Sequence, residues 1–224
     1  MTFGRKVLEF YNELNFSTGN IPDNIEVMLP LKDLKIQKLN EIFYDKYYND
    51  NEKRIFLIGI NPGRFGGGVT GIPFTDPIHL EEVLKIKNPL LKRHELSSKF
   101  IYSVIKGVGG PDIFFKKCYL TAVSPVGFIL NGKNINYYDS KKLSEKFESQ
   151  FTYWLKKQIS FGAYTEIAFS LGRGKNFDFL QNLNKAHRLF KQILALPHPR
   201  WVMQYRYPER NKFVDIYLEQ LNKF

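Results

Sequence analysis

Four short apolar runs, each followed by a loop and a helical pattern, constrain the fold of this chain more than any other feature. The runs are RIFLIGI at 54–60, CYLTAV at 118–123, EIAFSL at 166–171 and QILALP at 192–197. Continuous apolar runs of this length are typical of strands buried on both faces. Strands that alternate with helices predict an α/β fold of three layers, α/β/α, around a central four-stranded and mainly parallel sheet.

Helical patterns lie between these runs and at both ends of the chain. They cover 3–15, 31–48, 97–108, 139–159, a stretch after Lys175, and 208–224. We expect Ser97 or Ser98 to cap one helix, Asp139 to cap another and Pro208 to open the last. The 224 residues suffice for one full core, so we expect a single domain over 1–224.

The charge balance points to a polyanionic partner. Lys and Arg number 33 against 22 Asp and Glu, a net charge of +11. This favours nucleic acid, phosphates or an anionic membrane, although a merely basic protein has the same signature. No run approaches a membrane span and the N-terminus lacks the apolar core of a signal peptide, so we expect a cytoplasmic protein. The single Cys118 excludes an intrachain disulfide and a cysteine-ligated metal site within one chain.

Polar residues follow the four predicted strands: Asn61, Ser124, Arg173 and His198. Ligands of parallel α/β sheets bind beyond the carboxyl ends of the strands. We therefore expect these residues to converge on one crevice, although they are far apart in the sequence.

Asn61 and His198 each allow two interpretations. Asn61 is a common turn former, but an amide held rigidly between a strand and Pro62-Gly63 can also orient a water molecule. We expect Gly63 to leave open space beside this loop. His198 is either structural or the donor of a neutral N–H to an anion that forms in the transition state. The segment after it carries Arg200, Arg206, Arg210 and Lys212 among aromatic residues, which suits a phosphate backbone and a wedge into stacked bases.

The glycine-rich loop GINPGRFGGGVTG after the first strand offers a rival function. Glycine-rich turns after strands often bind phosphates, which would indicate a nucleotide-binding enzyme. The loop contains neither the Walker pattern nor a dinucleotide fingerprint, and SLGRGKN at 170–176 is only loosely similar to a phosphate loop.

The segment GINPGRFGGGVTGIPF, from Gly59 to Phe74, resembles the first motif of the single-strand-selective monofunctional uracil-DNA glycosylases, within the uracil-DNA glycosylase superfamily. That motif reads Gly-Met-Asn-Pro-Gly-Pro-Phe-Gly, then Thr-Gly-Val-Pro-Phe. HELSSKFIYSVI, YLTAVSPVGF and LPHP are similar to later motifs in the same order, so the resemblance covers most of the chain from residue 54 onward. The sequence most resembles a divergent bacterial branch of this family.

The resemblance implies a role for each matching residue. Asn61 would position the attacking water, Phe74 would stack on a flipped base, and His198 would bond the base oxygen as negative charge builds there. The base pocket would comprise Gly59, Ile60, Gly63, Phe74, Ala122 and Ser124. The DNA contacts would come from Ser97, Ser98, Arg173, Lys175, Arg200, Tyr205, Arg206 and Arg210, with the wedge between Arg200 and Arg210.

These roles agree with the chemistry that the residues allow. Uracil is a tolerable leaving anion, so base excision needs charge stabilisation and a placed water rather than a strong nucleophile, and the base must leave the stack. We expect a monomer that acts on DNA, without metal, cofactor or strand cleavage. The alternatives are a catalytically weak member that binds damaged or single-stranded DNA, and the nucleotide-binding enzyme.

Two positions bear on the choice of base. The animal enzymes read uracil with an Asn on the second strand, and Ala122 stands at that place. Discrimination would then depend on backbone groups, Ser124, Asn134 or Asn136, and it is expected to be weaker. Gly63 stands where a sibling family has a bulky aromatic residue, which would admit 5-hydroxymethyluracil or a purine such as xanthine.

Overall fold

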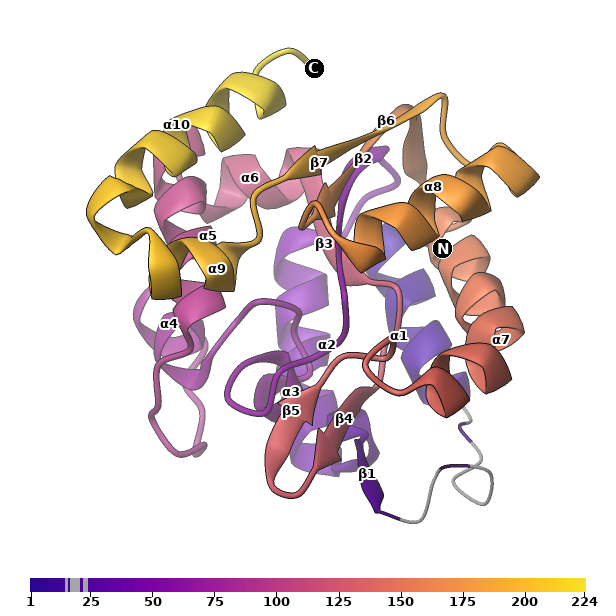
Figure 1. Ribbon diagram of the computed structural model, residues 1–224. Helices are drawn as coiled ribbons and strands as arrows, with labels where there is room; N and C mark the ends of the chain where they lie inside the picture. Colours follow the sequence, from indigo (N-terminus) through magenta and orange to yellow (C-terminus); the bar gives the residue numbers. More distant parts are fainter. Residues whose placement is uncertain (15, 17–20, 22–23) are drawn as a thin grey trace.

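The computed structural model describes residues 1–14, 16, 21 and 24–224 (Figure 1). A four-stranded sheet in the order β3-β2-β6-β7 forms its centre. Every pairing in this sheet is parallel, and Ile58 of the central strand β2 lies opposite Thr121 on one side and Ser170 on the other. The predicted parallel sheet is therefore confirmed. The strands are β2 (Arg54–Gly59), β3 (Cys118–Ala122), β6 (Ala163–Leu171) and β7 (Gln192–Leu196).

Helices cover both faces of this sheet, which makes the three predicted layers. One face carries α7 (Lys141–Ile159) and α8 (Lys175–His187) (Figure 1). The other carries α5 (Leu96–Val108), α6 (Pro111–Lys117) and α10 (Arg210–Leu221). Since both faces are covered, every residue of β2 is buried. At the N-terminal end, α1 (Phe3–Glu13) packs against α7 and against α2 (Leu34–Tyr47), which follows the short 3-10 turn η2 (Pro30–Lys32).

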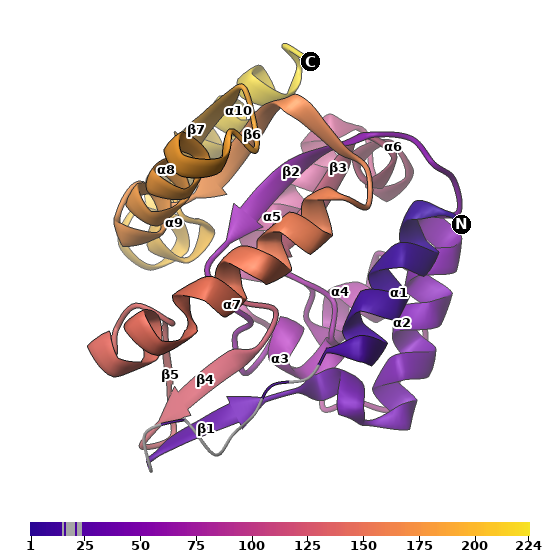
Figure 2. The same ribbon diagram turned by 90° about the vertical axis from the view of Figure 1, so that its right-hand side faces the viewer.

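A second sheet, which the apolar runs do not indicate, lies beyond the end of β2 (Figure 2). Its antiparallel strands β1 (Ile25–Met28), β4 (Gly127–Leu130) and β5 (Lys133–Ile135) are ordered β1-β4-β5. Asn131 and Gly132 connect β4 to β5 with φ angles of 51° and 69°. Positive φ at both central residues is the two-residue hairpin geometry that Asn-Gly favours.

Several predicted helix ends are wrong by a few residues. Ser140, not Asp139, caps α7, because its hydroxyl accepts the N–H of Leu143. Glu95 is the N-cap residue of α5, so Ser97 and Ser98 lie inside the first turn. Pro208 belongs to the 3-10 turn η3 (Tyr207–Glu209), and the last helix begins at Arg210.

The first helix ends at Glu13, and residue 15 of the predicted range lies outside the described residues. Nowhere in the described part of the chain is a helix both long enough and apolar enough to cross a membrane.

Candidate active site

The carboxyl ends of the parallel strands open into one cavity of about 850 Å³. Of the four residues expected to converge, Asn61 after β2, Arg173 after β6 and His198 after β7 line it, whereas the third strand contributes Ala122 in place of Ser124. Because the strands are parallel, their ends meet at one edge of the sheet, as the sequence pattern indicates. The volume lies in the range of small-molecule sites in proteins, so the cavity has room for a single nucleobase.

Asn61 stands at the tip of β2, and backbone groups hold both ends of its amide. Its Oδ1 accepts the N–H of Tyr137 at 3.0 Å, and its Nδ2 donates to the C=O of Ile135 at 3.2 Å. A backbone N–H only donates and a carbonyl only accepts, so these partners identify the oxygen end of the amide. Oδ1 retains a second lone pair, which can accept a hydrogen bond from water.

His198 follows β7 and is the N-cap residue of α9 (Pro199–Tyr205). Its Nδ1 accepts the backbone N–H of Arg200 at 3.1 Å, so the proton of the neutral ring is on Nε2. Burial lowers the pKa of His198 to about 4, and the charge of Arg200 acts in the same direction. At neutral pH the imidazole is therefore an uncharged N–H donor in the cavity wall.

The ring of Phe74 lies against the end of β2. A Cβ added to Gly59 would come within 2.7 Å of Phe74 Cζ, so only glycine leaves room for the ring there. Phe74 itself has a positive φ of 56°, which few residues with a side chain adopt. Phe74 lines the cavity with Ile60, whereas Gly59 contributes by admitting the ring.

Ala122 and Ser124, both predicted to contact the base, are placed differently. Ala122 lies opposite Gly59 in the sheet and lines the cavity. Ser124 is fully buried, and its hydroxyl donates to the C=O of Val126 at 2.8 Å. Since this hydroxyl is committed inside the protein, Ser124 does not substitute for a base-reading amide at Ala122.

The expectation of open space beside Gly63 is wrong. A Cβ on Gly63 would lie 2.6 Å from Glu95 Oε1 and 3.2 Å from Asn134 Nδ2. Gly63 lines the cavity, but the volume beside it is filled by these two side chains. The glycine therefore admits Glu95 and Asn134 rather than a substituent of the base.

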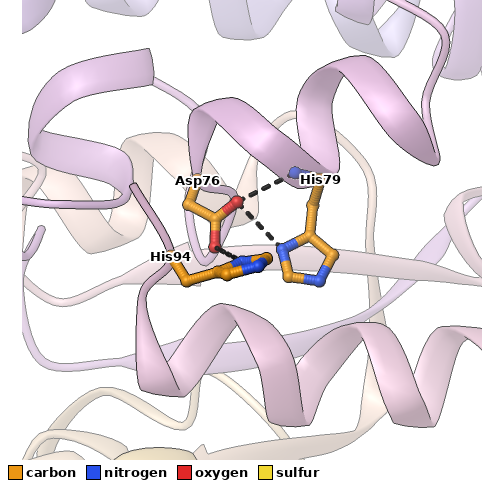
Figure 3. Close-up of side chains that lie close together, drawn as sticks. All are labelled: Asp76, His79 and His94. Atoms are coloured by element: carbon orange, nitrogen blue, oxygen red, sulfur yellow. Dashed lines mark hydrogen bonds and ion pairs between the residues drawn. The ribbon is translucent and has the colours of Figure 1, made fainter. Parts of the chain in front are cut away.

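The start of α5 is held in place by a buried carboxylate, Asp76 (Figure 3). Asp76 caps α4 (Pro77–Glu82), and its Oδ1 accepts the N–H of Ile78, the N–H of His79 and the ring Nδ1 of His79. Its Oδ2 accepts the N–H of Glu95 at 2.9 Å and lies 3.7 Å from His94 Nδ1.

Burial opposes ionisation of Asp76, but hydrogen bonds from the ring and N–H of His79 and from the N–H of Glu95 outweigh it. They hold the pKa of Asp76 at about 2. Asp76, His79 and His94 place three potential metal-ligand atoms within 4.8 Å of one another. Asp76 already accepts several N–H donors, so the group is a hydrogen-bond network that positions Glu95.

The two serines predicted to contact phosphates also differ. Ser97 lines the cavity. Ser98 is fully buried, and its hydroxyl accepts the N–H of Asp76 at 3.2 Å and lies 3.0 Å from His79 Nδ1. The hydroxyl of Ser98 is thus unable to reach DNA, and its role is to join α5 to the Asp76 network.

Most of the remaining predicted DNA contacts are exposed, and only some of them line the cavity. We call the segment Trp201–Arg210 the rim. Trp201, Tyr205 and Tyr207 are 40%, 61% and 52% exposed. The guanidinium of Arg206 lies 5.5 Å from the Trp201 ring and that of Arg210 lies 4.4 Å from the Tyr207 ring. Arg200 and Tyr205 line the cavity with Arg173, while Lys175, exposed at the start of α8, lies over Tyr138.

Glu95 and Asn176 line the cavity but were not predicted as site residues, whereas Asn134 and Asn136, which also line it, were named as possible base readers. Asn134 and Asn136 stand in and just after β5, so they belong to the site because the second sheet lies there. Asn176 is buried, and its Oδ1 accepts the hydroxyl of Tyr137 at 3.1 Å, which ties α8 to the segment that holds Asn61. For Glu95, the one available signal was its position two residues before the helical pattern at 97–108.

Comparison with known proteins agrees with this geometry. The model of the uracil DNA glycosylase superfamily matches residues 46–222. The single-strand selective monofunctional uracil DNA glycosylase of Mus musculus is 27% identical over 110 residues, 41% of this chain and 39% of that protein. For the Rattus norvegicus protein the values are 27% over 114 residues, 43% and 41%. The chain thus spans about two fifths of the length of these curated relatives.

A solved structure matches over a greater length. The crystal structure of wild-type Pedobacter heparinus SMUG2 is 40% identical, covers 100% of both chains and has a TM-score of 0.95. The superfamily match extends over most of the chain and includes the ends of all four parallel strands. This chain therefore belongs to the uracil-DNA glycosylase superfamily.

Proposed function

We propose that this chain is a monofunctional DNA glycosylase that flips uracil out of DNA and hydrolyses its N-glycosidic bond in base excision repair. The observation that carries this proposal is the pairing, in one cavity, of a backbone-held amide at Asn61 with a neutral N–H donor at His198. Membership of the superfamily and the names of the relatives support it.

The two groups suit the two charges that develop in this reaction. As the bond between base and sugar breaks, the base takes the electron pair and the sugar becomes cationic. Nε2–H of His198 is a donor for the oxygen of the departing base, and such a preorganised donor is most effective where charge develops. Asn61 holds the water that attacks the sugar carbon. Neither step requires a strong nucleophile or a covalent intermediate, so no strand cleavage follows.

The surroundings of the cavity suit a flipped base in DNA. Phe74 offers an aromatic face for stacking. Ser97, Arg173 and Arg200 line the cavity and Lys175 is exposed at the start of α8, so these residues are our candidates for phosphate contacts. Tyr205 lines the cavity and is 61% exposed, which makes it our candidate for the wedge. We propose that the chain is a single domain that works as a monomer.

The range of bases that we expect this enzyme to excise depends on Ala122, which lines the cavity. An alanine offers no hydrogen bond from its side chain, so the pocket discriminates bases less strictly than one with an amide. The amide of Asn136 lines the same cavity and is our candidate for a replacement reader. With about 850 Å³ available, we expect activity on xanthine as well as uracil. Activity on 5-hydroxymethyluracil has no comparable support, because Glu95 and Asn134 fill the space beside Gly63 that its 5-substituent was expected to take.

The test is release of free base from oligonucleotides that contain uracil, xanthine, hypoxanthine or 5-hydroxymethyluracil, in single and double strands. We expect free uracil and an intact abasic strand. Tight DNA binding without base release would instead support a catalytically weak, DNA-binding member of the superfamily. Binding of free nucleotides without DNA binding would support a nucleotide-binding enzyme.

A further inference from the structure

Glu95 is the one carboxyl group among the described residues that line the cavity. It immediately precedes α5, and its Oε1 lies 2.6 Å from the place that a Cβ on Gly63 would take. A Cβ on Gly66 would overlap its Oε2. The carboxyl group therefore lies against the loop that carries Asn61, two residues beyond that amide.

The carboxyl group is held at this position but has no internal partner. The backbone N–H of Glu95 donates to Asp76, which fixes the residue. Within the described residues, however, neither of its carboxylate oxygens has a hydrogen-bond partner, and neither is fully buried, so both remain accessible from the cavity. A partly buried carboxyl without a partner loses hydration and gains nothing in return, which is typical of a functional group rather than a structural one.

The charges around Glu95 set its protonation. Burial raises the pKa of Glu95 to about 7, the negative charge of Asp76 adds to this rise, and Arg200 opposes it. His79, which belongs to α4, and His94 also lie beside the Asp76 carboxylate (Figure 3). A carboxyl group poised near neutral pH can both accept and release a proton there.

The reaction proposed above leaves one proton without a recipient. When water attacks the sugar carbon, one of its protons must leave. The amide of Asn61 is not a base, and His198 has its Nδ1 occupied and its Nε2 protonated. The tyrosine and arginine side chains in the cavity wall are of types that do not act as proton acceptors near neutral pH. Among the side chains that line the cavity, Glu95 therefore remains as the acceptor for this proton.

We propose that the Glu95 carboxylate accepts a proton from the water molecule that Asn61 positions, and that Glu95 is thus a third catalytic residue. This inference rests on the proposed glycosylase function. The water oxygen bonds to the sugar carbon as the bond to the base nitrogen breaks. The base leaves with the electron pair, the water proton passes to Glu95 and then to solvent, and the base anion takes a proton from solvent.

The test uses Glu95→Gln, which keeps the shape and polarity of the side chain but is unable to take a proton. We expect the single-turnover rate on a uracil oligonucleotide to fall about 10²-fold, as for loss of a general base, with unchanged DNA affinity. The wild-type rate should rise with pH through about 7, because the carboxylate forms above the pKa of Glu95. The Glu95→Gln rate should stay flat across this range, and Glu41→Gln, an exposed change on α2, should behave like wild type.

The outcomes separate this inference from the proposed function. Wild-type rates in Glu95→Gln, with wild-type pH dependence, would overturn the role of Glu95 while leaving the glycosylase function intact. A Glu95→Gln enzyme that is faster above pH 7 would mean that the neutral acid binds the base, and would also overturn it. DNA binding without base release by the wild type would refute the glycosylase function itself, and the proton acceptor with it.

Discussion

The two sides of the cavity are built differently. On the side of β2, Asn61 is held by two backbone partners from the segment after β4, and Ala122 lies in the sheet beside it. We call these two residues and their backbone supports the floor. On the side of β7, the rim presents aromatic rings and guanidinium groups to solvent, and these rings and cations contact mainly one another. His198 stands between the two regions, at the start of α9.

The difference matches two physical tasks. Transition-state stabilisation requires groups that hold their geometry before the substrate arrives, since reorganisation during the reaction costs free energy. Binding a flexible phosphate backbone and prising a base from its stack require exposed cations and aromatic rings. We therefore expect changes in the floor and at His198 to slow chemistry, and changes in the rim to alter binding and the preference for duplex or single strands.

The largest effect should come from His198→Ala. Loss of one preorganised donor should reduce the single-turnover rate about 10²–10³-fold with little change in DNA affinity. Because the pKa of His198 is about 4, the neutral ring is the active form, and the loss should be equal at pH 6 and pH 8. His187→Ala, an exposed change on α8, is the matched control. A loss seen only in DNA affinity would mean that His198 contributes to DNA binding, as the rim does, and not to the chemical step.

Asn61→Ala should lower base excision by roughly 10²-fold, the range for one positioned catalytic group. DNA affinity should change little, because Asn61 belongs to the floor and not to the rim. The variant also loses two hydrogen bonds to the segment around Tyr137, so its thermal unfolding must be measured beside Asn51→Ala, an exposed control. Near-normal turnover in a folded variant would contradict the water-positioning role.

In the rim, Arg206→Ala should weaken activity on duplex DNA several-fold more than on single strands. A wedge matters only where a base must be pushed out, and Arg206 packs over the exposed Trp201. The measurement is the ratio of excision rates on the two substrates, with Lys156→Ala on α7 as the control. Equal loss on both substrates would make Arg206 a simple phosphate contact.

The smallest effect should come from Ala122→Asn. A new amide in the floor should raise the rate on uracil relative to xanthine, because it pairs with the edge of uracil and meets a larger base with a clash or an unpaired group. One net hydrogen bond of ~1 kcal/mol corresponds to about fivefold. The readout is the uracil to xanthine rate ratio. An unchanged ratio in a folded variant would mean that Ala122 does not contact the base.

Much of the floor could be predicted from local sequence. The four apolar runs mark the parallel strands, and polar residues directly after them mark the site, because parallel strands end at one edge. The β4–β5 hairpin was not predicted, although Asn131-Gly132 is a strong hairpin signal. That omission hid the partner that holds Asn61.

Other properties of the site depend on contacts between distant segments. The hydroxyl of Ser98 is buried because Asp76 and His79 pack against it, and the space beside Gly63 is filled because α5 brings Glu95 there. Neither fact has a local signal, since each joins residues about twenty or more positions apart.

The sequence by itself determined the central parallel sheet, the alternation of strands and helices along the chain, and which residue types stand at the strand ends. These features follow from apolar periodicity and turn residues, which act over short distances. Tertiary structure alone decided how those residues behave. It fixed the amide of Asn61 through the second sheet, kept His198 neutral by burial, and left Glu95 without a partner beside Gly63. Protonation and orientation depend on the dielectric surroundings and on hydrogen-bond partners, and these exist only once the chain has packed.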